Sequence, residues 1–367
     1  MLRKLLPVIL LLLMLGGCAE KVSSPARDAS ASFFAMDTYM SIRAYGADGD
    51  TLRDCQHLVD GLEAMLSTTR EGSEIASLNR GEAVALSPET RELLAFALEL
   101  SRETDGALDI SVYPVVKAWG FTTGDYRVPG PEELSALLEH VDHRAITLGE
   151  GEVTLPEGME VDLGSVAKGY IGDRLCALLR ARGVESAILD LGGNVQALGE
   201  KPDGSPWRVG IRDPEKDGLL GIADLRDEAA VTSGGYERYF TDEEGRLWWH
   251  IIDPKSGYPA RSGLIGVTVV GPSGLRCDAL STALFILGED GAIDYWRDHR
   301  DFQMALVTED ERLLLTPELA RRFTPEPGIS YTLEVIPDDE DQELDPMDTG
   351  GYADPGDPEL ADADENE

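Results

Sequence analysis

The segment CDALSTALFILG, residues 277–288, combines oxygen-bearing side chains with an apolar helical pattern. Asp278 and Thr282 are four residues apart, so they share one face of a helix, and Ser281 lies between them. A carboxylate and hydroxyls are oxygen donors, which hard cations prefer. Mg²⁺ takes few protein ligands and completes its coordination shell with water and substrate phosphate. The spacing therefore predicts a magnesium site in an enzyme of phosphate chemistry.

A second segment, VDLGSVAKGYIGD at residues 161–173, predicts a site for an anion. Ser165 lies where a helix is expected to begin, and Lys168 falls on its first turn. A helix start presents unpaired N–H groups and a positive dipole end, which favour an anion. Lys168 can neutralise a phosphate, and Asp162 or the Ser165 carbonyl can reach a cation. In the structural alternative, Asp162 or Ser165 only caps the helix and Lys168 is solvated.

The segment TDGALDISVYPVVKAWGF, residues 104–121, carries a carboxylate and several aromatic rings. Asp109 lies in a probable strand-like stretch between apolar residues. Tyr113, Trp119 and Phe121 can supply a flat wall for an aromatic ligand ring. The alternative for these rings is an ordinary place in the hydrophobic core.

Two later segments carry hydroxyls and a histidine. In AVTSGGYERYF, residues 230–240, the hydroxyls of Thr232 and Ser233 precede Gly234-Gly235, whose backbone can approach a ligand closely. A tight turn is the alternative for this segment. His250 precedes a turn at residues 253–257. At neutral pH it can act as a general base, or it can be a structural histidine bound to a nearby carbonyl.

The N-terminus predicts export. Arg3 and Lys4 precede an apolar run over residues 5–15, which is shorter than a membrane-spanning helix of about 20 residues. Residues 1–17 are therefore expected to be a signal peptide. The sequence LGGC at residues 15–18 resembles a bacterial lipobox, which implies a lipid on Cys18 and a location in the cell envelope, at the periplasmic face of the cytoplasmic membrane. A plain secretory signal is the alternative. Residues 18–32 then form a polar tether.

The C-terminus is strongly acidic. Residues 331–367 are expected to form a disordered tail, since Pro337–Glu367 contains 14 Asp or Glu and no Lys or Arg. The whole chain carries a net charge of −37, so −37 + 14 leaves −23 on the rest. This balance argues against nucleic-acid binding, which needs basic surface. After Cys18, the remaining cysteines form no CxxC pair, so a zinc site is not expected, and Cys176 is expected to be a buried free thiol.

Residues 33–330 must position these groups, as one large domain or two joined lobes. Helices are predicted over residues 50–66, 88–103 and 165–182 and from Asp278 onward. Strands are predicted over residues 33–45, 187–191, 207–212, 248–252, 264–270 and 303–308. The order lacks a regular β-α-β rhythm and contains no GxGxxG or P-loop motif. This favours an α+β fold over a doubly wound sheet.

Eight segments, in sequence order, resemble the ApbE family of FAD:protein FMN transferases, over residues 33–325. They are MDTYM (36–40), SEIASLN (73–79), DGALDIS (105–111), VDLGSVAKGY (161–170), LDLGGN (189–194), TSGGYERY (232–239), HIIDP (250–254) and DALSTALFILG (278–288). The resemblance implies the α+β flavin transferase fold of this family, with mixed sheets packed with helices and an FAD cleft between lobes.

The resemblance also implies an activity. Family members use FAD as a substrate, transfer its FMN half to a Thr or Ser hydroxyl of a target protein with Mg²⁺, and release AMP. The expected partners are flavin-accepting subunits of membrane redox complexes, with the chain held at the membrane through Cys18. An FAD pyrophosphatase that forms FMN and AMP, and a non-catalytic flavin-binding lipoprotein, are the alternatives.

The family motifs further imply roles for individual residues. Asp278, Thr282 and the Ser165 carbonyl correspond to Mg²⁺ ligands. Ser281 is expected to be a further ligand, although it stands where some relatives have Asp. His250 corresponds to a proposed base, and Lys168 to a charge beside the diphosphate. Thr69 stands where many relatives have Tyr. The positions that correspond to FAD contacts are Met36, Ala107, Leu108, Asp109, Asp162, Lys168 and Ile252.

Overall fold

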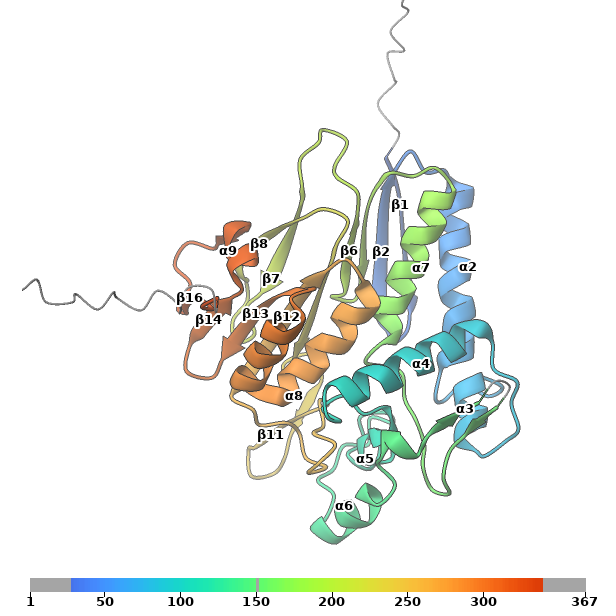
Figure 1. Cartoon of the computed structure of the whole chain (residues 1–367). Coiled ribbons are helices and arrows are strands. Elements are labelled where there is room, and N and C mark those ends of the chain that lie inside the picture. Colours follow the sequence, from blue (N-terminus) through green and yellow to red (C-terminus); the bar gives the residue numbers. More distant parts are fainter. Residues whose placement is uncertain (1–27, 150–151, 339–367) are drawn as a thin grey trace, which may run out of the picture.

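A computed structural model describes residues 28–149 and 152–338, and its centre is a large mixed sheet (Figure 1). Among these residues, nine strands pair in the order β1-β2-β5-β6-β9-β12-β13-β14-β16. Neighbouring strands are antiparallel, except that β14 and β16 are parallel. The strands are β1 (Asp28–Ala35), β2 (Thr38–Tyr45), β5 (Ser186–Leu191), β6 (Val195–Leu198), β9 (Ala229–Gly234), β12 (Leu264–Gly271), β13 (Gln303–Thr308), β14 (Arg312–Leu315) and β16 (Thr332–Val335). This arrangement confirms the α+β class.

Helices cover one face of the sheet and a small second sheet covers part of the other. The helices on the sheet are α2 (Gly49–Leu66), α7 (Ala167–Ala181) and α8 (Gly274–His299), and α4 (Pro88–Glu103) lies next to α8. The small sheet contains β7 (Trp207–Arg212), β8 (Leu219–Leu225) and β15 (Phe323–Pro325). Successive residues of a strand point to opposite faces. Met304 of β13 therefore joins the core beneath the helices, whereas Ala305 joins the core beneath the small sheet.

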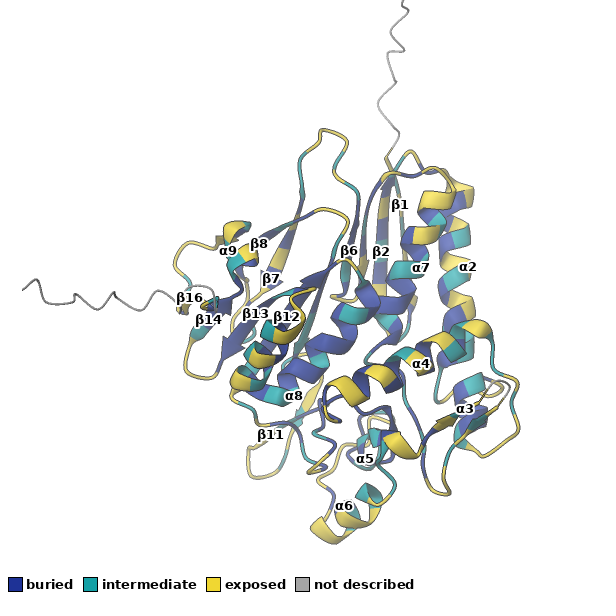
Figure 2. Cartoon of the chain, in the orientation of Figure 1, coloured by how far each residue is buried: buried dark blue, intermediate teal, exposed yellow. Residues whose placement is uncertain are grey.

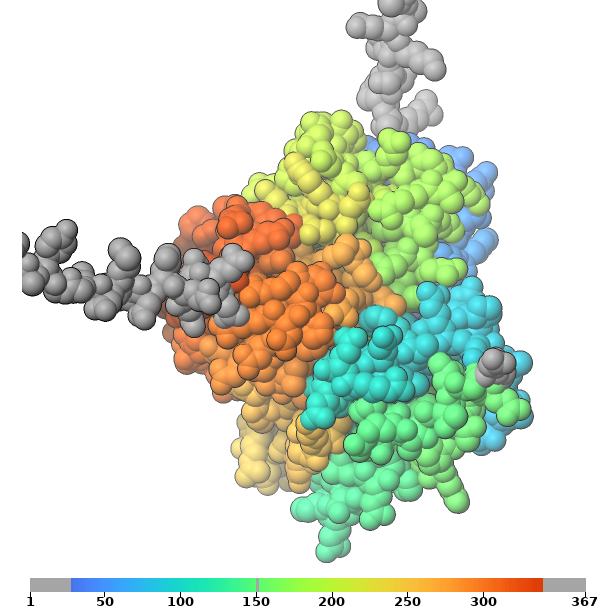
Figure 3. All heavy atoms as spheres, viewed as in Figure 1, coloured from blue at the N-terminus to red at the C-terminus, as the bar shows by residue number. Residues whose placement is uncertain are grey.

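A third apolar cluster lies in the part of the chain that follows α4. It joins α5 (Tyr113–Ala118) and α6 (Pro131–Leu138) to the hairpin of β10 (Tyr239–Thr241) and β11 (Leu247–Trp249). Helix α6 is mostly exposed, whereas α7 and α8 are buried where they face the sheet (Figure 2). The surface of α4 meets that of α8 directly, where Glu103 pairs with Arg276 and accepts from the Tyr295 hydroxyl at 2.9 Å (Figure 3).

The remaining elements are short. They are α3 (Glu74–Asn79), η1 (Ile110–Val112), η2 (His143–Ala145), β3 (Thr147–Leu148), β4 (Val153–Thr154) and α9 (Pro317–Arg321). Helix α8 is interrupted at Gly288, whose φ of +78° is not helical. Across the described ranges, every helix is too short or too polar to cross a bilayer.

Several boundaries differ from the sequence-based expectation. The strand expected over residues 248–252, for example, is β11 and ends at Trp249. The strand expected over residues 33–45 is a hairpin, because Met36 and Asp37 turn the chain with φ values of 51° and 58°. Residues 28–32, assigned to the tether, belong to β1 and pair with β2. Residues 331–336, assigned to the tail, belong to the fold, because β16 pairs with β14 and Ile336 is buried. Residues 1–27, with Cys18, and residues 339–367 lie outside the described ranges.

The three described cysteines are buried, unpaired thiols, as expected for Cys176. Burial raises the pKa of Cys55 to about 11 and that of Cys176 to about 12. Such thiols are protonated at neutral pH and are not available as nucleophiles.

Candidate active site at the start of helices α7 and α8

Helices α7 and α8 touch backbone to backbone near their N-terminal ends. A Cβ atom added to Gly169 of α7 would lie 2.1 Å from the carbonyl oxygen of Gly274 in α8. The Asp173 carboxylate accepts from the N–H groups of Gly274 (2.8 Å) and Leu275 (3.0 Å), which supplies the start of α8 with a cap from another helix. These contacts fix the first turns of the two helices against each other.

Asp278 lies at this helix crossing and is only 4% exposed. Its Oδ2 accepts from the Gly169 N–H at 2.8 Å. Burial raises the pKa of Asp278, whereas the charge of Lys168, the Gly169 N–H and the Asn194 side chain favour the ionised form. Two segments that are about 110 residues apart in sequence thus place the predicted lysine and carboxylate together.

A hydroxyl cluster adjoins Asp278. Ser233 Oγ lies 2.8 Å from Ser281 Oγ and 3.2 Å from Thr282 Oγ1. Ser281 Oγ donates to the Asp278 carbonyl at 2.8 Å and is fully buried, so it links β9 to α8 rather than facing a ligand. Thr282 is half-buried. Thr232 points to the opposite face of the sheet, where its hydroxyl lies 2.8 Å from that of Thr268.

Ser165 does not cap helix α7. The N-cap residue is Val166, which makes no side-chain capping bond, and Ser165 is half-buried one residue earlier. The capping alternative for Ser165 is therefore wrong, whereas the Asp162 carboxylate accepts from the backbone N–H groups of Leu163 and Gly164. The use of the Ser165 carbonyl as a ligand stays a prediction.

Charged residues from several segments gather around Lys168. Its charge favours the ionised carboxylates of Asp162, Glu237 and Asp278 and disfavours protonation of His250. Burial raises the pKa of Asp162, and it raises that of Glu237 to about 6. Asp162 is nevertheless half-exposed and Glu237 exposed. We call Asp162, Lys168, Glu237, Arg238, His250 and Asp278 the charged cluster.

His250 is held in one tautomer. Its backbone N–H donates to the Arg238 carbonyl at 3.1 Å, and its Nδ1 lies 3.2 Å from the same oxygen. A carbonyl only accepts, so Nδ1 carries the proton and Nε2 keeps a lone pair. Burial lowers the pKa of His250 to about 4, so the ring is neutral at pH 7. His250 therefore makes its structural contact through Nδ1, and its Nε2 keeps a lone pair that can accept a proton.

The β1–β2 turn lies beside the charged cluster. Met36 has left-handed backbone geometry, and its N–H donates to Glu63 Oε1 at 3.0 Å. Asp37 pairs with Arg238 at 3.2 Å. A non-glycine residue with positive φ stores backbone strain and is often found at functional sites. The contact of Met36 with FAD stays a prediction.

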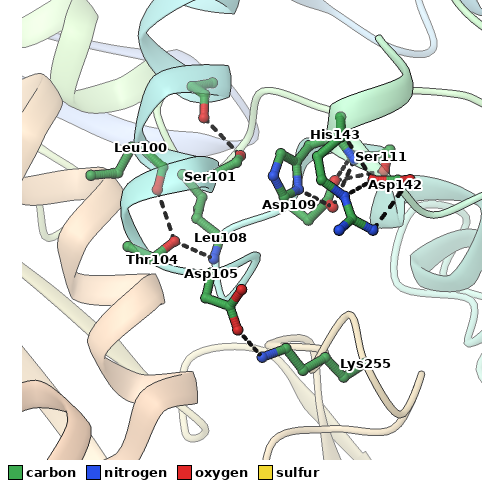
Figure 4. Close-up of polar contacts among 12 residues, drawn as sticks. Leu100, Ser101, Thr104, Asp105, Leu108, Asp109, Ser111, Asp142, His143 and Lys255 are labelled. Carbon is green, nitrogen blue, oxygen red and sulfur yellow. Dashed lines mark hydrogen bonds and ion pairs between the residues drawn. The ribbon is translucent and has the colours of Figure 1, made fainter.

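Asp109 anchors a loop. Its Oδ1 accepts from Ser111 N–H (2.9 Å) and Oγ (2.6 Å), and its Oδ2 accepts from the His143 N–H (3.0 Å) and lies 2.9 Å from His143 Nδ1 (Figure 4). It begins η1 and is not in a strand, contrary to the sequence-based expectation. These contacts occupy the carboxylate, so the side chain positions the loop. Any ligand contact at Asp109 would therefore be made by its backbone groups.

Three other predicted FAD contacts are buried. Ala107, Leu108 and Ile252 are 4%, 2% and 4% exposed, and their contact with FAD stays a prediction. The two loops that carry these residues lie side by side, because Lys255 donates to Asp105 at 2.9 Å (Figure 4).

The aromatic wall is not realised. Trp119 is fully buried, and its Nε1 donates to the Gly257 carbonyl at 2.8 Å. Tyr113 and Phe121 are each 4% exposed. The core reading of these rings is therefore confirmed, and they form no ligand-facing wall. Thr69 is exposed.

The donor set suits a weakly held Mg²⁺ better than zinc. Within residues 28–149 and 152–338, no group of three His, Cys, Asp or Glu side chains could hold a metal ion. One carboxylate, from Asp278, would act with neutral oxygens such as the Thr282 hydroxyl and the Ser165 carbonyl. Mg²⁺ accepts such a partial set because water and substrate phosphate complete its shell. The metal ligands remain a prediction.

Sequence reasoning missed Glu237, Arg238 and Asn194 as members or neighbours of this site. The Glu-Arg pair lies one residue beyond the two glycines of TSGGYERY, and this position was the available signal. Two surface cavities lie elsewhere. One, of about 450 Å³, is lined by Asp213 and residues 326–330, and the other, of about 350 Å³, by Tyr126 and residues 240–244.

Comparisons with known proteins give a consistent result. The sequence model of the ApbE family matches residues 36–306. An FAD:protein FMN transferase of Klebsiella pneumoniae is 32% identical over 298 residues, which cover 79% of this chain and 92% of the relative. One of Treponema pallidum is 34% identical over 277 residues, 70% and 76% of the two chains. The crystal structure of the ApbE protein from Thermotoga maritima matches with a TM-score of 0.75 at 29% identity, covering 81% of this chain and 99% of that one. The flavin transferase ApbE from Vibrio cholerae matches with a TM-score of 0.74 at 28% identity, covering 81% and 100%.

Proposed function

Because the chain belongs to the ApbE family and is an FAD:protein FMN transferase, we propose that it uses Mg²⁺ to transfer FMN from FAD to a Thr or Ser hydroxyl, releasing AMP. One observation carries this proposal. Lys168, Asp278 and a neutral His250 with a free Nε2 come from three separate segments and gather at the start of α7 and α8.

The reaction needs an attack at phosphorus and a good leaving group. The acceptor oxygen forms a bond to the phosphorus of the FMN half, and the bond from that phosphorus to the bridging oxygen breaks. The bridging oxygen and its negative charge leave with AMP. His250 Nε2 accepts the hydroxyl proton, and the Lys168 ammonium stabilises the charge that develops on the leaving phosphate.

Asp278, Thr282 and the Ser165 carbonyl would hold Mg²⁺. When bound, the ion would supply additional positive charge beside the diphosphate. Asp278 reaches this role as a carboxylate because Lys168 and the Gly169 N–H favour its ionised form.

We also propose that the protein acts in the cell envelope, anchored through lipid on Cys18 at the periplasmic face of the cytoplasmic membrane. Flavin-accepting subunits of membrane redox complexes would be its partners. The apolar run over residues 5–15, followed by LGGC, supports the anchor. A Cys18→Ser variant is expected to lose the lipid, which mass spectrometry of the N-terminal peptide and membrane fractionation would detect. An unmodified N-terminus in the native protein would contradict the anchor.

The transferase is tested by incubating the protein with FAD and Mg²⁺, with and without an acceptor domain. AMP release that requires the acceptor, together with the mass of one FMN on a Thr or Ser of that domain, supports the proposal. AMP release without acceptor indicates a pyrophosphatase, and tight FAD binding without AMP indicates a flavin-binding protein. An Asp278→Asn variant, which keeps the side-chain shape, is expected to bind less metal and to lose transfer.

A further inference from the structure

A pocket of about 350 Å³ lies where the loop after α5 meets the β10–β11 hairpin. It is lined by Tyr126, Arg127 and Val128 from the loop and by residues 240–244 from the hairpin. The rings of Tyr126 and Phe240 are stacked, with centroids 5.2 Å apart. Tyr126 and Val128 are nevertheless 44% and 43% exposed. Exposed apolar side chains that line a hollow are typical of a binding site. We call this hollow the Tyr126 pocket.

A single buried ring lies between the Tyr126 pocket and the proposed base. The ring centroid of Phe121 lies 5.7 Å from that of Tyr126 and 6.4 Å from that of His250. Tyr126 and His250 are therefore at most 5.7 + 6.4, or 12.1 Å, apart. The Phe121 carbonyl accepts from Arg238 at 3.5 Å, and the Arg238 carbonyl holds His250, so one residue connects the two sides. An extended chain advances about 3.3 Å per residue, so about four residues cover this distance.

The hairpin side of the Tyr126 pocket is negatively charged. The Asp242 carboxylate is used within the hairpin, where it accepts two hydrogen bonds. Glu243 and Glu244 are exposed, and their carboxylates have no ionic partner within residues 28–149 and 152–338. Arg127, the cation of the lining, is already paired with Glu133. The whole chain carries a net charge of −37, so an acidic partner would be repelled and a basic side chain attracted here.

We propose that the Tyr126 pocket binds the acceptor protein, with an apolar side chain of the acceptor in the pocket and a Lys or Arg facing Glu243 and Glu244. This inference rests on the proposed function, in which the acceptor hydroxyl meets His250 Nε2. The distance to His250 places the apolar residue within about four residues of the Thr or Ser that receives FMN. The pocket thus contributes to the choice of acceptor, whereas the charged cluster binds FAD.

The first test is the dependence of FMN transfer on acceptor concentration, with the soluble domain of a flavin-accepting subunit as the probe. Val128→Ser removes apolar surface from the pocket. Val335→Ser is the matched control, because Val335 is 49% exposed on β16 and does not line the pocket. Val128→Ser is expected to raise the KM for the acceptor by about 5- to 30-fold. Its kcat and FAD affinity, and all three quantities in the control, should be unchanged.

Two further measurements test the partner's chemistry. Glu243→Lys should raise the KM for the acceptor by about 2- to 10-fold at low salt, and by less as salt is added. Its control is Glu185→Lys, because Glu185 is also exposed but precedes β5. On the acceptor, serine in place of an apolar residue within four positions of the modified Thr or Ser should raise the KM with the wild type. The same change should add little with Val128→Ser, because the contact is already lost.

Several outcomes would overturn the inference. These are an unchanged KM for the acceptor in Val128→Ser, or an equal rise in Val335→Ser. Loss of FAD affinity in Val128→Ser would show that the pocket holds part of FAD, and loss of self-association would show that it holds a second copy of this chain. Any of these results with intact transfer leaves the proposed function standing. A wild type that transfers no FMN refutes the proposed function, and equilibrium binding of the same acceptor domain then decides the inference. Absent binding, or equal affinity of the wild type and Val128→Ser, contradicts it.

Discussion

The contact between α7 and α8 makes a sharp prediction for Gly169→Ala. The new Cβ atom would lie 2.1 Å from the Gly274 carbonyl oxygen and 2.7 Å from Asp278 Cβ, whereas Cβ atoms essentially never approach within 3.0 Å. The helices must separate by 3.0 − 2.1, or about 0.9 Å. Overpacking costs about 1–3 kcal/mol, and the strained bond from the Gly169 N–H to Asp278 is worth up to about 1.5–3 kcal/mol. The higher helix propensity of alanine relative to glycine offsets about 0.5–1 kcal/mol of this loss. The expected net loss of stability is about 2–5 kcal/mol.

The assay is urea and thermal unfolding, and Gly61→Ala in α2 is the matched control. Gly61 is also inside a helix, but a Cβ atom there meets nothing within 4 Å. The control is expected to gain up to about 1 kcal/mol. Gly169→Ala should also bind less metal, because Asp278 moves with α8. Equal stability of the two variants, with unchanged metal affinity, would show that the helices do not touch as described.

Three further predictions concern His250, Glu237 and the C-terminus. His250→Ala should lower the rate of transfer by about 10²- to 10⁴-fold. The wild-type rate should stay constant down to about pH 5, because the pKa of His250 is about 4. An inflection of the rate near pH 6.5 would contradict the assignment of His250 as the base. The pKa of Glu237 is raised to about 6, so its contribution to stability is full below pH 4.5 and is lost as pH rises through 6. Glu237→Gln should therefore become more stable relative to the wild type as pH rises from 4.5 to 7. Parallel plots of unfolding free energy against pH for the two proteins would refute the shift. Deletion of residues 339–367 should leave the melting temperature unchanged, whereas deletion from Thr332 removes β16 and should lower it; equal melting temperatures would show that β16 adds no stability.

Elements with a strong periodic pattern were predictable from sequence. The helix predicted over residues 88–103 has those bounds, as do the strands predicted over residues 207–212 and 303–308. The turn at Met36-Asp37 was not predictable, because tight hairpin turns usually contain Asn-Gly or Asp-Gly. The start of α8 was also missed. Asp278 lies in its second turn, since Ser273 caps the helix four residues before Cys277.

The site was predictable by residue type but not by arrangement. Spacing within one segment could relate Asp278 to Thr282, but no local pattern relates Lys168 to Asp278. Their proximity depends on the Gly169–Gly274 contact between two helices, which is a tertiary feature. Family resemblance alone connected the two segments before the structure did.

Two side chains illustrate why residue type alone is a weak guide. The carboxylate of Asp109 is a group that commonly binds ligands, but Ser111 and His143 already occupy it. Glu237 follows a glycine turn, where a charged residue is usually solvated, yet crowding raises its pKa to about 6. In both cases at least one partner comes from a distant segment, His143 for Asp109 and Lys168 for Glu237, so only the fold reveals the role.

A crystal structure with FAD and Mn²⁺ in place of Mg²⁺ tests the central claim most directly, because anomalous scattering locates the metal. We expect the diphosphate between the Lys168 ammonium and Asp278, with the metal bound by the Asp278 carboxylate and the Thr282 hydroxyl. A dinucleotide bound elsewhere, for example in the cavity beside Asp213, or a metal without Asp278 among its ligands, would contradict the account.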